Sequence, residues 1–164
     1  MMKLGLVSAI LPDDSFEQVI DYAAAVGFTC VEVCCWPKGK AVRRYAGITH
    51  IDLDESDAAK LLYYRDYAAK KGVAISSLGY YPNAMDANEE AAAVAIQHLY
   101  KLIDASAHMG VNMVTTFIGK DKNKTVEDNL DKFETVWKPI VAYARKRAFA
   151  SALRTARCCT RRTN

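Results

Sequence analysis

The chain has 164 residues, 51% of them hydrophobic, so it is long enough for one ordinary domain with a core of its own. Its formal net charge is +3, but Arg154, Arg157, Arg161 and Arg162 lie near the end, and residues 1–147 carry −1. A near-neutral body gives no electrostatic footprint for nucleic acid, and no apolar run approaches the roughly 20 residues that span a bilayer. We therefore expect a cytoplasmic globular protein that binds neither nucleic acid nor membrane.

Four short apolar runs, rich in β-branched residues, are the strongest pattern in the chain. They cover residues 3–9, 30–36, 73–78 and 113–119. Each run is too short for a helix and is followed by turn-forming residues, which is typical of parallel strands buried on both faces. The third run is the clearest, because it ends in the polar loop Gly79-Tyr80-Tyr81-Pro82-Asn83.

A helical pattern follows each run. Ser15 can cap the first helix, and Thr125 with Asp128 three residues on can cap the fourth. The second and third helices are expected near residues 54–71 and 87–109. Short helix-to-strand returns after the first three helices force the strands to be parallel, with right-handed crossovers. The sequence thus predicts an α/β chain of about four parallel βα units whose strands all end at one edge.

Five strings together resemble the sugar phosphate isomerase/epimerase family with the xylose isomerase-like TIM barrel. They lie at residues 3–9, 30–33, 45–52, 79–83 and 116–119. The resemblance implies that residues 1–147 form the N-terminal half of such a barrel, a partial TIM barrel of four βα units. Complete TIM barrels have eight units and about 250 residues.

Residues 148–164 depart from the family. They show no strand pattern and no acidic residue, whereas the family continues here with a strand whose Glu-Asn pair supplies a metal-binding carboxylate. The codons for residues 148–164 can also be read in a shifted frame that includes Glu-Asn-Cys-Pro-Met, and Arg154 to Cys159 correspond to that string out of frame. We interpret residues 148–164 as a non-native tail that results from a frameshift, and expect it to be disordered.

The resemblance implies carbohydrate metabolism, with aldose–ketose isomerisation or epimerisation of a small-molecule sugar or sugar phosphate as the parent activity. Complete members are expected to use a divalent metal, Mn, Mg or Zn, to polarise a hydroxy-carbonyl unit. Their metal ligands come from strands five to eight. We therefore expect this fragment to retain no metal site and to be inactive alone.

The remaining candidates are substrate-facing residues at the strand ends, each with a structural alternative. Glu32 is a charge inside an apolar strand and faces either the barrel mouth or an ion-pair partner. Backbone bonding for His50 and packing for Trp36 are the alternatives at those positions. The candidate substrate-binding set is Glu32, Trp36, His50, Tyr81, Asn83 and Thr116. A core role is expected for Phe117, and Lys38, Lys40, Arg43 and Arg44 are either phosphate ligands or a solvated loop.

Two other functions compete with the isomerase hypothesis. Half a barrel has open edge strands and an exposed sheet face, so it could self-associate as a non-catalytic binding module. Abasic-site DNA endonucleases share the barrel, but the neutral body and the three histidines disfavour them. Metal-dependent turnover would separate the first two hypotheses, since fold alone does not.

Overall fold

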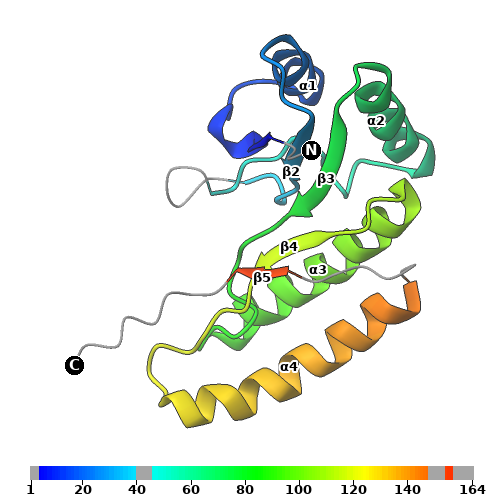
Figure 1. Cartoon of the computed structure of the whole chain (residues 1–164). Coiled ribbons are helices and arrows are strands. Elements are labelled where there is room, and N and C mark those ends of the chain that lie inside the picture. The colour runs from blue at the N-terminus through cyan, green and yellow to red at the C-terminus, as the bar shows by residue number, and fades with distance from the viewer. Residues whose placement is uncertain (1–3, 40–45, 148–153, 157–164) are drawn as a thin grey trace.

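The computed structural model describes residues 4–39, 46–147 and 154–156. Its centre is a five-stranded sheet in the order β1-β2-β3-β4-β5, and every neighbouring pair is parallel. The strands are β1 (Gly5–Val7), β2 (Cys30–Cys34), β3 (Ala74–Gly79), β4 (Val114–Phe117) and β5 (Arg154–Ala156). This topology confirms the predicted parallel βα units (Figure 1).

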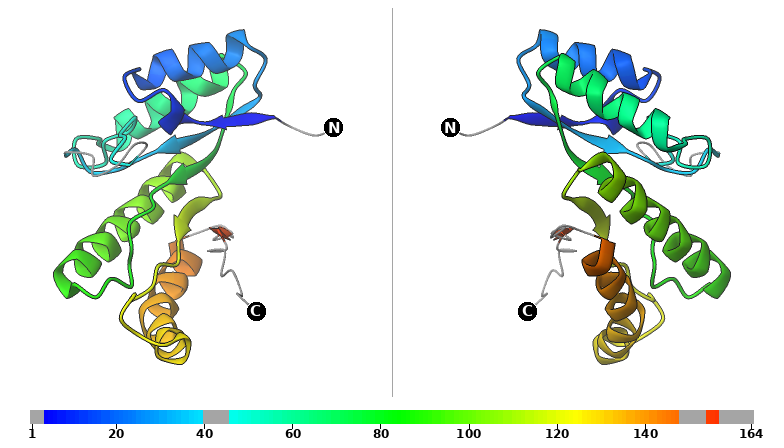
Figure 2. Two further views of the ribbon diagram at one scale, coloured as in Figure 1. Left: turned by 90° about the vertical axis from the view of Figure 1, so that its left-hand side faces the viewer. Right: turned by 90° about the vertical axis from the view of Figure 1, so that its right-hand side faces the viewer.

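The helices are α1 (Phe16–Ala25), α2 (Ala58–Lys70), α3 (Glu89–Met109) and α4 (Val126–Arg147), and a short 3-10 turn, η1 (Ser8–Ile10), follows β1. They lie around the outside of a strongly curved sheet, as the two side views show (Figure 2). None of these helices combines the length and the hydropathy needed to cross a membrane, within the part of the chain that is described.

Two of the predicted caps are formed. Ser15 Oγ accepts a hydrogen bond from the Gln18 backbone N–H at 3.3 Å, and Gln18 Oε1 accepts one from the Ser15 N–H at 2.7 Å. Thr125 Oγ1 accepts from the Asp128 N–H at 3.1 Å. These bonds satisfy N–H groups that the first helical turn leaves without partners. The helix boundaries therefore follow from local sequence chemistry.

The core lies between the sheet and the helices. Val31, Val33 and Leu78 project from the strands and are completely buried, and Leu102 of α3 and Trp137 of α4 are buried against the same cluster. Side chains alternate along a strand, so the neighbours of Val31 and Val33 project to the opposite face of the sheet. We call that opposite face the inner face, because it corresponds to the interior of a closed barrel.

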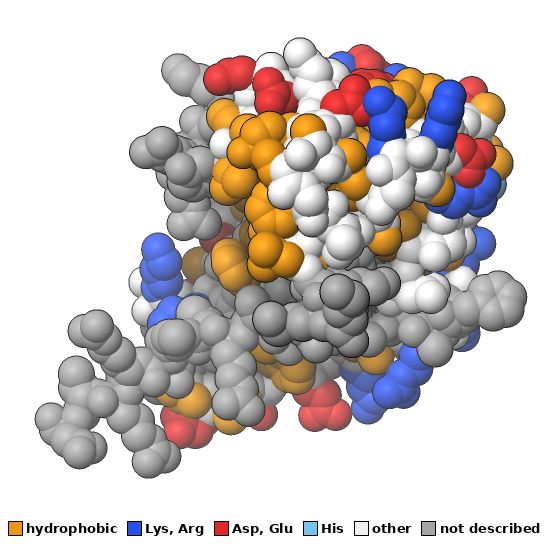
Figure 3. All heavy atoms as spheres, turned by 45° about the horizontal axis from the view of Figure 1, so that its top comes forward, with side chains coloured by type: hydrophobic (Ala, Val, Ile, Leu, Met, Phe, Trp, Pro, Cys, Tyr) orange, Lys and Arg blue, Asp and Glu red, His pale blue; other side chains and the backbone are white. Residues whose placement is uncertain are grey.

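The described helices leave the inner face uncovered. Val7 at the end of β1 and Phe117 at the end of β4 each remain 40% exposed. In Figure 1 this is the near side of the sheet, where β4 passes in front of α3. Figure 3 shows exposed hydrophobic side chains gathered on the part of the molecule built from β1, β2 and β3 with α1 and α2.

One strand lies where the sequence shows no strand pattern. β5 pairs with β4 in parallel, with Thr115 opposite Arg154 and Phe117 opposite Ala156. The free edge of β4 offers backbone N–H and C=O groups to any extended segment, whatever its side chains. The frameshift origin of residues 148–164 stays a prediction.

Candidate functional site

The carboxyl ends of β1 to β4 and the loops that follow them form one edge of the sheet, and Glu32 lies near this edge on the inner face. Its Oε2 accepts a hydrogen bond from Ser77 Oγ at 2.9 Å, and its Oε1 accepts one from the Tyr81 hydroxyl. Among the described residues Glu32 forms no ion pair. Two hydroxyl groups, one from β3 and one from the loop that follows it, therefore hold this half-buried carboxylate in place of a basic side chain.

Gly79 makes the contact between Glu32 and Tyr81 possible. A β-carbon at this position would lie 3.0 Å from Glu32 Oε1 and 3.2 Å from the Tyr81 ring. Both distances are shorter than ordinary van der Waals contact, so any side chain would push the two groups apart. The missing side chain leaves a notch through which Tyr81 folds back over β3.

Tyr81 acts as a hydrogen-bond donor in this arrangement. Burial raises the pKa of its phenol well above the usual value, and the hydrogen bond to Glu32 raises it further. The phenol therefore keeps its proton at any physiological pH. Its ring also contacts Phe117, with the ring centroids 4.8 Å apart.

The positions of Phe117 and Thr116 on β4 differ from those expected from the sequence. Phe117 was expected in the core but is 40% exposed on the inner face, whereas Thr116 is 1% exposed and lies on the helix side with Val114. The alternation of side chains along β4 explains both positions, because Val114 fixes which residues face the helices. The structure therefore brings Phe117, and not Thr116, beside Tyr81 and Glu32.

Asn83 joins the loops that follow β3 and β4. Its Oδ1 accepts from the backbone N–H groups of Met85 and Lys120, each at 3.0 Å. Its Nδ2 donates to the Lys120 carbonyl oxygen at 2.8 Å and to Asp86 Oδ2 at 3.1 Å. Gly119 has a φ of +80°, and a β-carbon there would collide with the Asn83 amide. The amide is thus engaged within the chain, and its predicted contact with substrate stays a prediction.

His50 lies in the loop after β2 and is bonded to backbone. Its Nε2 is 3.1 Å from the Leu11 carbonyl oxygen, which can only accept, so Nε2 carries the proton. Burial lowers the pKa of the imidazole, which keeps the ring neutral. Its Nδ1 is buried and has no partner within the described residues.

Trp36 packs on the helix side of the sheet. Its ring meets the Tyr80 ring edge to face, with centroids 5.4 Å apart, and Tyr80 in turn contacts His98 of α3 at 4.3 Å. Among the described residues, no hydrogen bond or ring contact joins Trp36 or His50 to Glu32 or Tyr81. The roles of Trp36 and His50 in substrate binding remain predictions.

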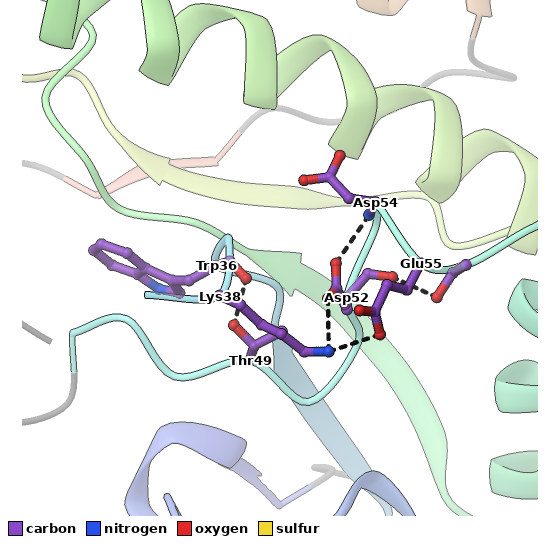
Figure 4. A network of polar contacts seen from close by, with 7 residues as sticks. Trp36, Lys38, Thr49, Asp52, Asp54 and Glu55 are labelled. Atoms are coloured by element: carbon purple, nitrogen blue, oxygen red, sulfur yellow. Dashed lines mark hydrogen bonds and ion pairs between the residues drawn. The ribbon is translucent and has the colours of Figure 1, made fainter. Parts of the chain in front are cut away.

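An ion-pair network holds the end of the long loop after β2 (Figure 4). Lys38 Nζ lies 2.6 Å from Glu55 Oε2 and 3.2 Å from Asp52 Oδ2, and Lys101 of α3 pairs with Asp54. Burial alone would raise the pKa of Asp52, but the Asp54 N–H and Lys38 outweigh it and lower the pKa. Lys38 is therefore neutralised by two carboxylates. The other candidate phosphate ligands, Lys40, Arg43 and Arg44, lie outside the described residues.

The described residues do not form a metal centre by themselves. No group of three or more His, Cys, Asp or Glu side chains in residues 4–39 and 46–147 is close enough to share an ion. The Glu32 carboxylate is already bonded to two hydroxyls, and His50 lies elsewhere in the mouth loops. The donor set present thus suits hydroxyl binding better than metal binding.

Comparison with known proteins now adds to the geometry. A family model described as the xylose isomerase-like TIM barrel matches residues 20–155. The chain belongs to this family. The family assignment accounts for the parallel sheet and for loops gathered at the strand ends, where TIM barrels carry their active sites. Comparison with curated protein sequences finds no match.

Solved structures support the same fold. D-psicose 3-epimerase from Clostridium cellulolyticum, solved with D-tagatose, is 14% identical with a TM-score of 0.66, over 89% of this chain and 50% of that one. L-ribulose 3-epimerase is 15% identical with a TM-score of 0.67, over 94% and 49%. The zinc-bound IolI protein is 15% identical with a TM-score of 0.64, over 93% and 51%. The chain thus spans about half the length of the solved structures that it matches.

Proposed function

We propose that residues 4–147 form the substrate-facing half of a sugar isomerase or epimerase, in which the other half of the barrel supplies the divalent metal. The observation that carries this proposal is the Glu32 carboxylate, held by Tyr81 and Ser77 on the inner face. The names of the similar structures, which include two sugar epimerases and a zinc-bound protein, support it by fold analogy.

The residues of this half would bind and orient the sugar. Glu32 keeps lone pairs free for the hydroxyl groups of a ligand, because a carboxylate accepts about four hydrogen bonds and two are used. Phe117 offers an exposed aromatic ring to the C–H face of a sugar. A bound divalent metal would polarise the hydroxy-carbonyl unit of the sugar. The chain alone would bind a sugar weakly and would not turn it over.

The first experiment is to resequence the gene through the codons for Arg147 and Ala148 and beyond. If the shifted frame continues into further βα units, the extended protein should interconvert ketoses or aldoses in the presence of Mn²⁺. Glu32→Gln should lower kcat/KM of that protein about tenfold or more, whereas the exposed Glu127→Gln should not change it. An extended protein without metal-dependent turnover would refute the proposal.

A second candidate is a self-associating half-barrel without catalytic activity. It is favoured by exposed apolar side chains on and beside the two outer strands: Leu4 just before β1 is 66% exposed, Ile10 of η1 is 55% exposed, and Val7 and Phe117 are each 40% exposed. Such a patch is a site for association, and two inner faces could cover each other. Sedimentation velocity of residues 1–164 should then show a dimer that Val7→Asp weakens. A chain that stays monomeric at high concentration would exclude this candidate.

We propose the cytoplasm as the compartment for either function. Cys30, Cys34 and Cys35 are free thiols, and reducing compartments keep thiols unpaired. Burial raises the pKa of both Cys34 and Cys35, so neither is a reactive thiolate. Fractionation of cells that express the chain would test the assignment, and recovery from an oxidising compartment would contradict it.

A further inference from the structure

The described inner-face positions of β1 to β4 carry one charge. The inner-face positions of β1 to β4, together with Tyr81 two residues after β3, are Gly5, Val7, Cys30, Glu32, Cys34, Ala74, Ser77, Gly79, Tyr81, Thr115 and Phe117. Glu32 is an acid, and this set contains neither Lys nor Arg. The only ionisable side chain with a full charge among these positions is therefore the acid Glu32.

We infer that Glu32 makes the β1–β4 half of the site select the uncharged, hydroxyl-bearing part of a sugar and reject a phosphate ester. The inference rests on the proposed function, because it takes a sugar as the ligand. Beyond the proposed function, the inference specifies that the part of the sugar bound beside Glu32 is uncharged.

The hydrogen-bonding capacity of Glu32 supports the selection. The oxygens of an ionised carboxylate can only accept hydrogen bonds, so they match sugar hydroxyls, which donate. A phosphate monoester is mostly dianionic at neutral pH and presents acceptors with negative charge. Placed beside Glu32, it would lose hydrogen bonds and add repulsion.

The orientation of Glu32 is fixed by its neighbours and not by the ligand. Ser77 and Tyr81 each donate to a different oxygen of the carboxylate. The notch at Gly79 lets Tyr81 reach it, and the raised pKa of Tyr81 keeps the phenol a donor. Because the carboxylate is already in position, a sugar hydroxyl would bind without the cost of ordering it.

The described lysine of the loop after β2, Lys38, does not offset this charge. Lys38 pairs with Asp52 and Glu55 in the network of Figure 4. It is therefore not available to receive a phosphate group. A phosphate on the substrate would therefore have to lie away from Glu32, toward basic residues outside the inner face of β1 to β4.

Nuclear magnetic resonance on the isotope-labelled full chain, residues 1–164, would test the inference. D-Fructose, D-fructose 6-phosphate and inorganic phosphate are the probes, and the amide signals of Glu32, Gly79 and Phe117 report binding. We expect D-fructose to shift these signals at millimolar concentrations. The phosphate ester should bind about tenfold more weakly, as expected for like charges a few ångströms apart in a half-buried site.

Three variants would show which property of the site causes the difference in affinity between D-fructose and D-fructose 6-phosphate. Glu32→Gln keeps the shape of the side chain and should bring the two sugar affinities close together. Tyr81→Phe removes the donor to Glu32 but keeps its charge, so it should weaken D-fructose binding and preserve the discrimination. Glu127→Gln, on the exposed first turn of α4, should change neither affinity.

Two results would overturn the inference in distinguishable ways. If the phosphate ester binds as tightly as D-fructose or more tightly, the charge selection is wrong while the sugar site stands. If neither sugar shifts the inner-face signals of a folded chain, the proposed function fails together with the inference.

Discussion

Replacing Asn83 by alanine would test how the mouth loops are held. The amide makes four hydrogen bonds, two with the backbone of Lys120 and one each with Met85 and Asp86. A typical net contribution is about 1 kcal/mol per bond, but water can replace the exposed bonds to Lys120. We expect Asn83→Ala to lower the free energy of unfolding by about 2 kcal/mol.

Gly119→Ala supplies the matching half of a double-mutant cycle. The positive φ of +80° at Gly119 should cost an alanine about 1 kcal/mol. The collision of its β-carbon with the Asn83 amide should add about 2 kcal/mol. In the Asn83→Ala background the collision disappears, so the double variant should be about 2 kcal/mol more stable than the sum of the single changes.

Urea unfolding followed by tryptophan fluorescence would measure all four proteins of the cycle. Trp137 is buried in the core and its indole N–H donates to the Ile118 carbonyl oxygen at 3.1 Å, so it reports on the same loop. Equal m-values would show that only stability has changed. Additive effects within about 0.5 kcal/mol would refute the direct contact between Asn83 and position 119.

Three further predictions follow from single groups. Gly79→Ala should separate Glu32 from Tyr81 and lower the phenol pKa toward its usual value, which nuclear magnetic resonance titration of a ring-labelled chain would detect. Burial lowers the pKa of His98, so its contribution to stability should be complete above the unfolded pKa of about 6.5 and should be lost as the pH falls toward the folded pKa. The urea midpoint of the unmodified chain should therefore decrease from pH 8 to pH 5. In His98→Gln the midpoint should depend less on pH. Leu78→Ala should cost about 3 kcal/mol by urea unfolding, because Leu78 is completely buried.

Much of the fold could be predicted from the sequence because it depends on local interactions. The strand at 73–78 and the Ser15 and Thr125 caps depend on residues close in sequence, and each is found in the structure. The start of α2 is later than expected, because Asp57 and not Asp54 caps it by accepting from the Lys60 N–H at 2.8 Å. Asp54 instead pairs with Lys101, 47 residues away in the chain, a contact that no local pattern encodes.

The candidate site was readable only in part. Glu32 could be found because a charge inside an apolar strand requires a polar partner. Phe117 and Gly79 could not, since their importance depends on which face of each strand is the inner one. For Asn83, the amide partner is the backbone of Lys120, 37 residues further on. The residue types near the strand ends therefore predicted where the candidate site lies in the fold, but not which residues contact each other there.

A register shift between β2 and β3 decides which side chains meet at Glu32. Val31 is opposite Ile75, but Glu32 is opposite Ser77, so Ser76 is an extra residue in β3. Such bulges are common beside active sites, where they redirect side chains. Without the extra residue, Glu32 would be opposite Ser76, and Cys34 would be opposite Leu78 instead of Gly79. The Ser77–Glu32 hydrogen bond therefore needs both the acid in β2 and the inserted residue in β3. Together they orient a carboxylate toward the open face of the sheet.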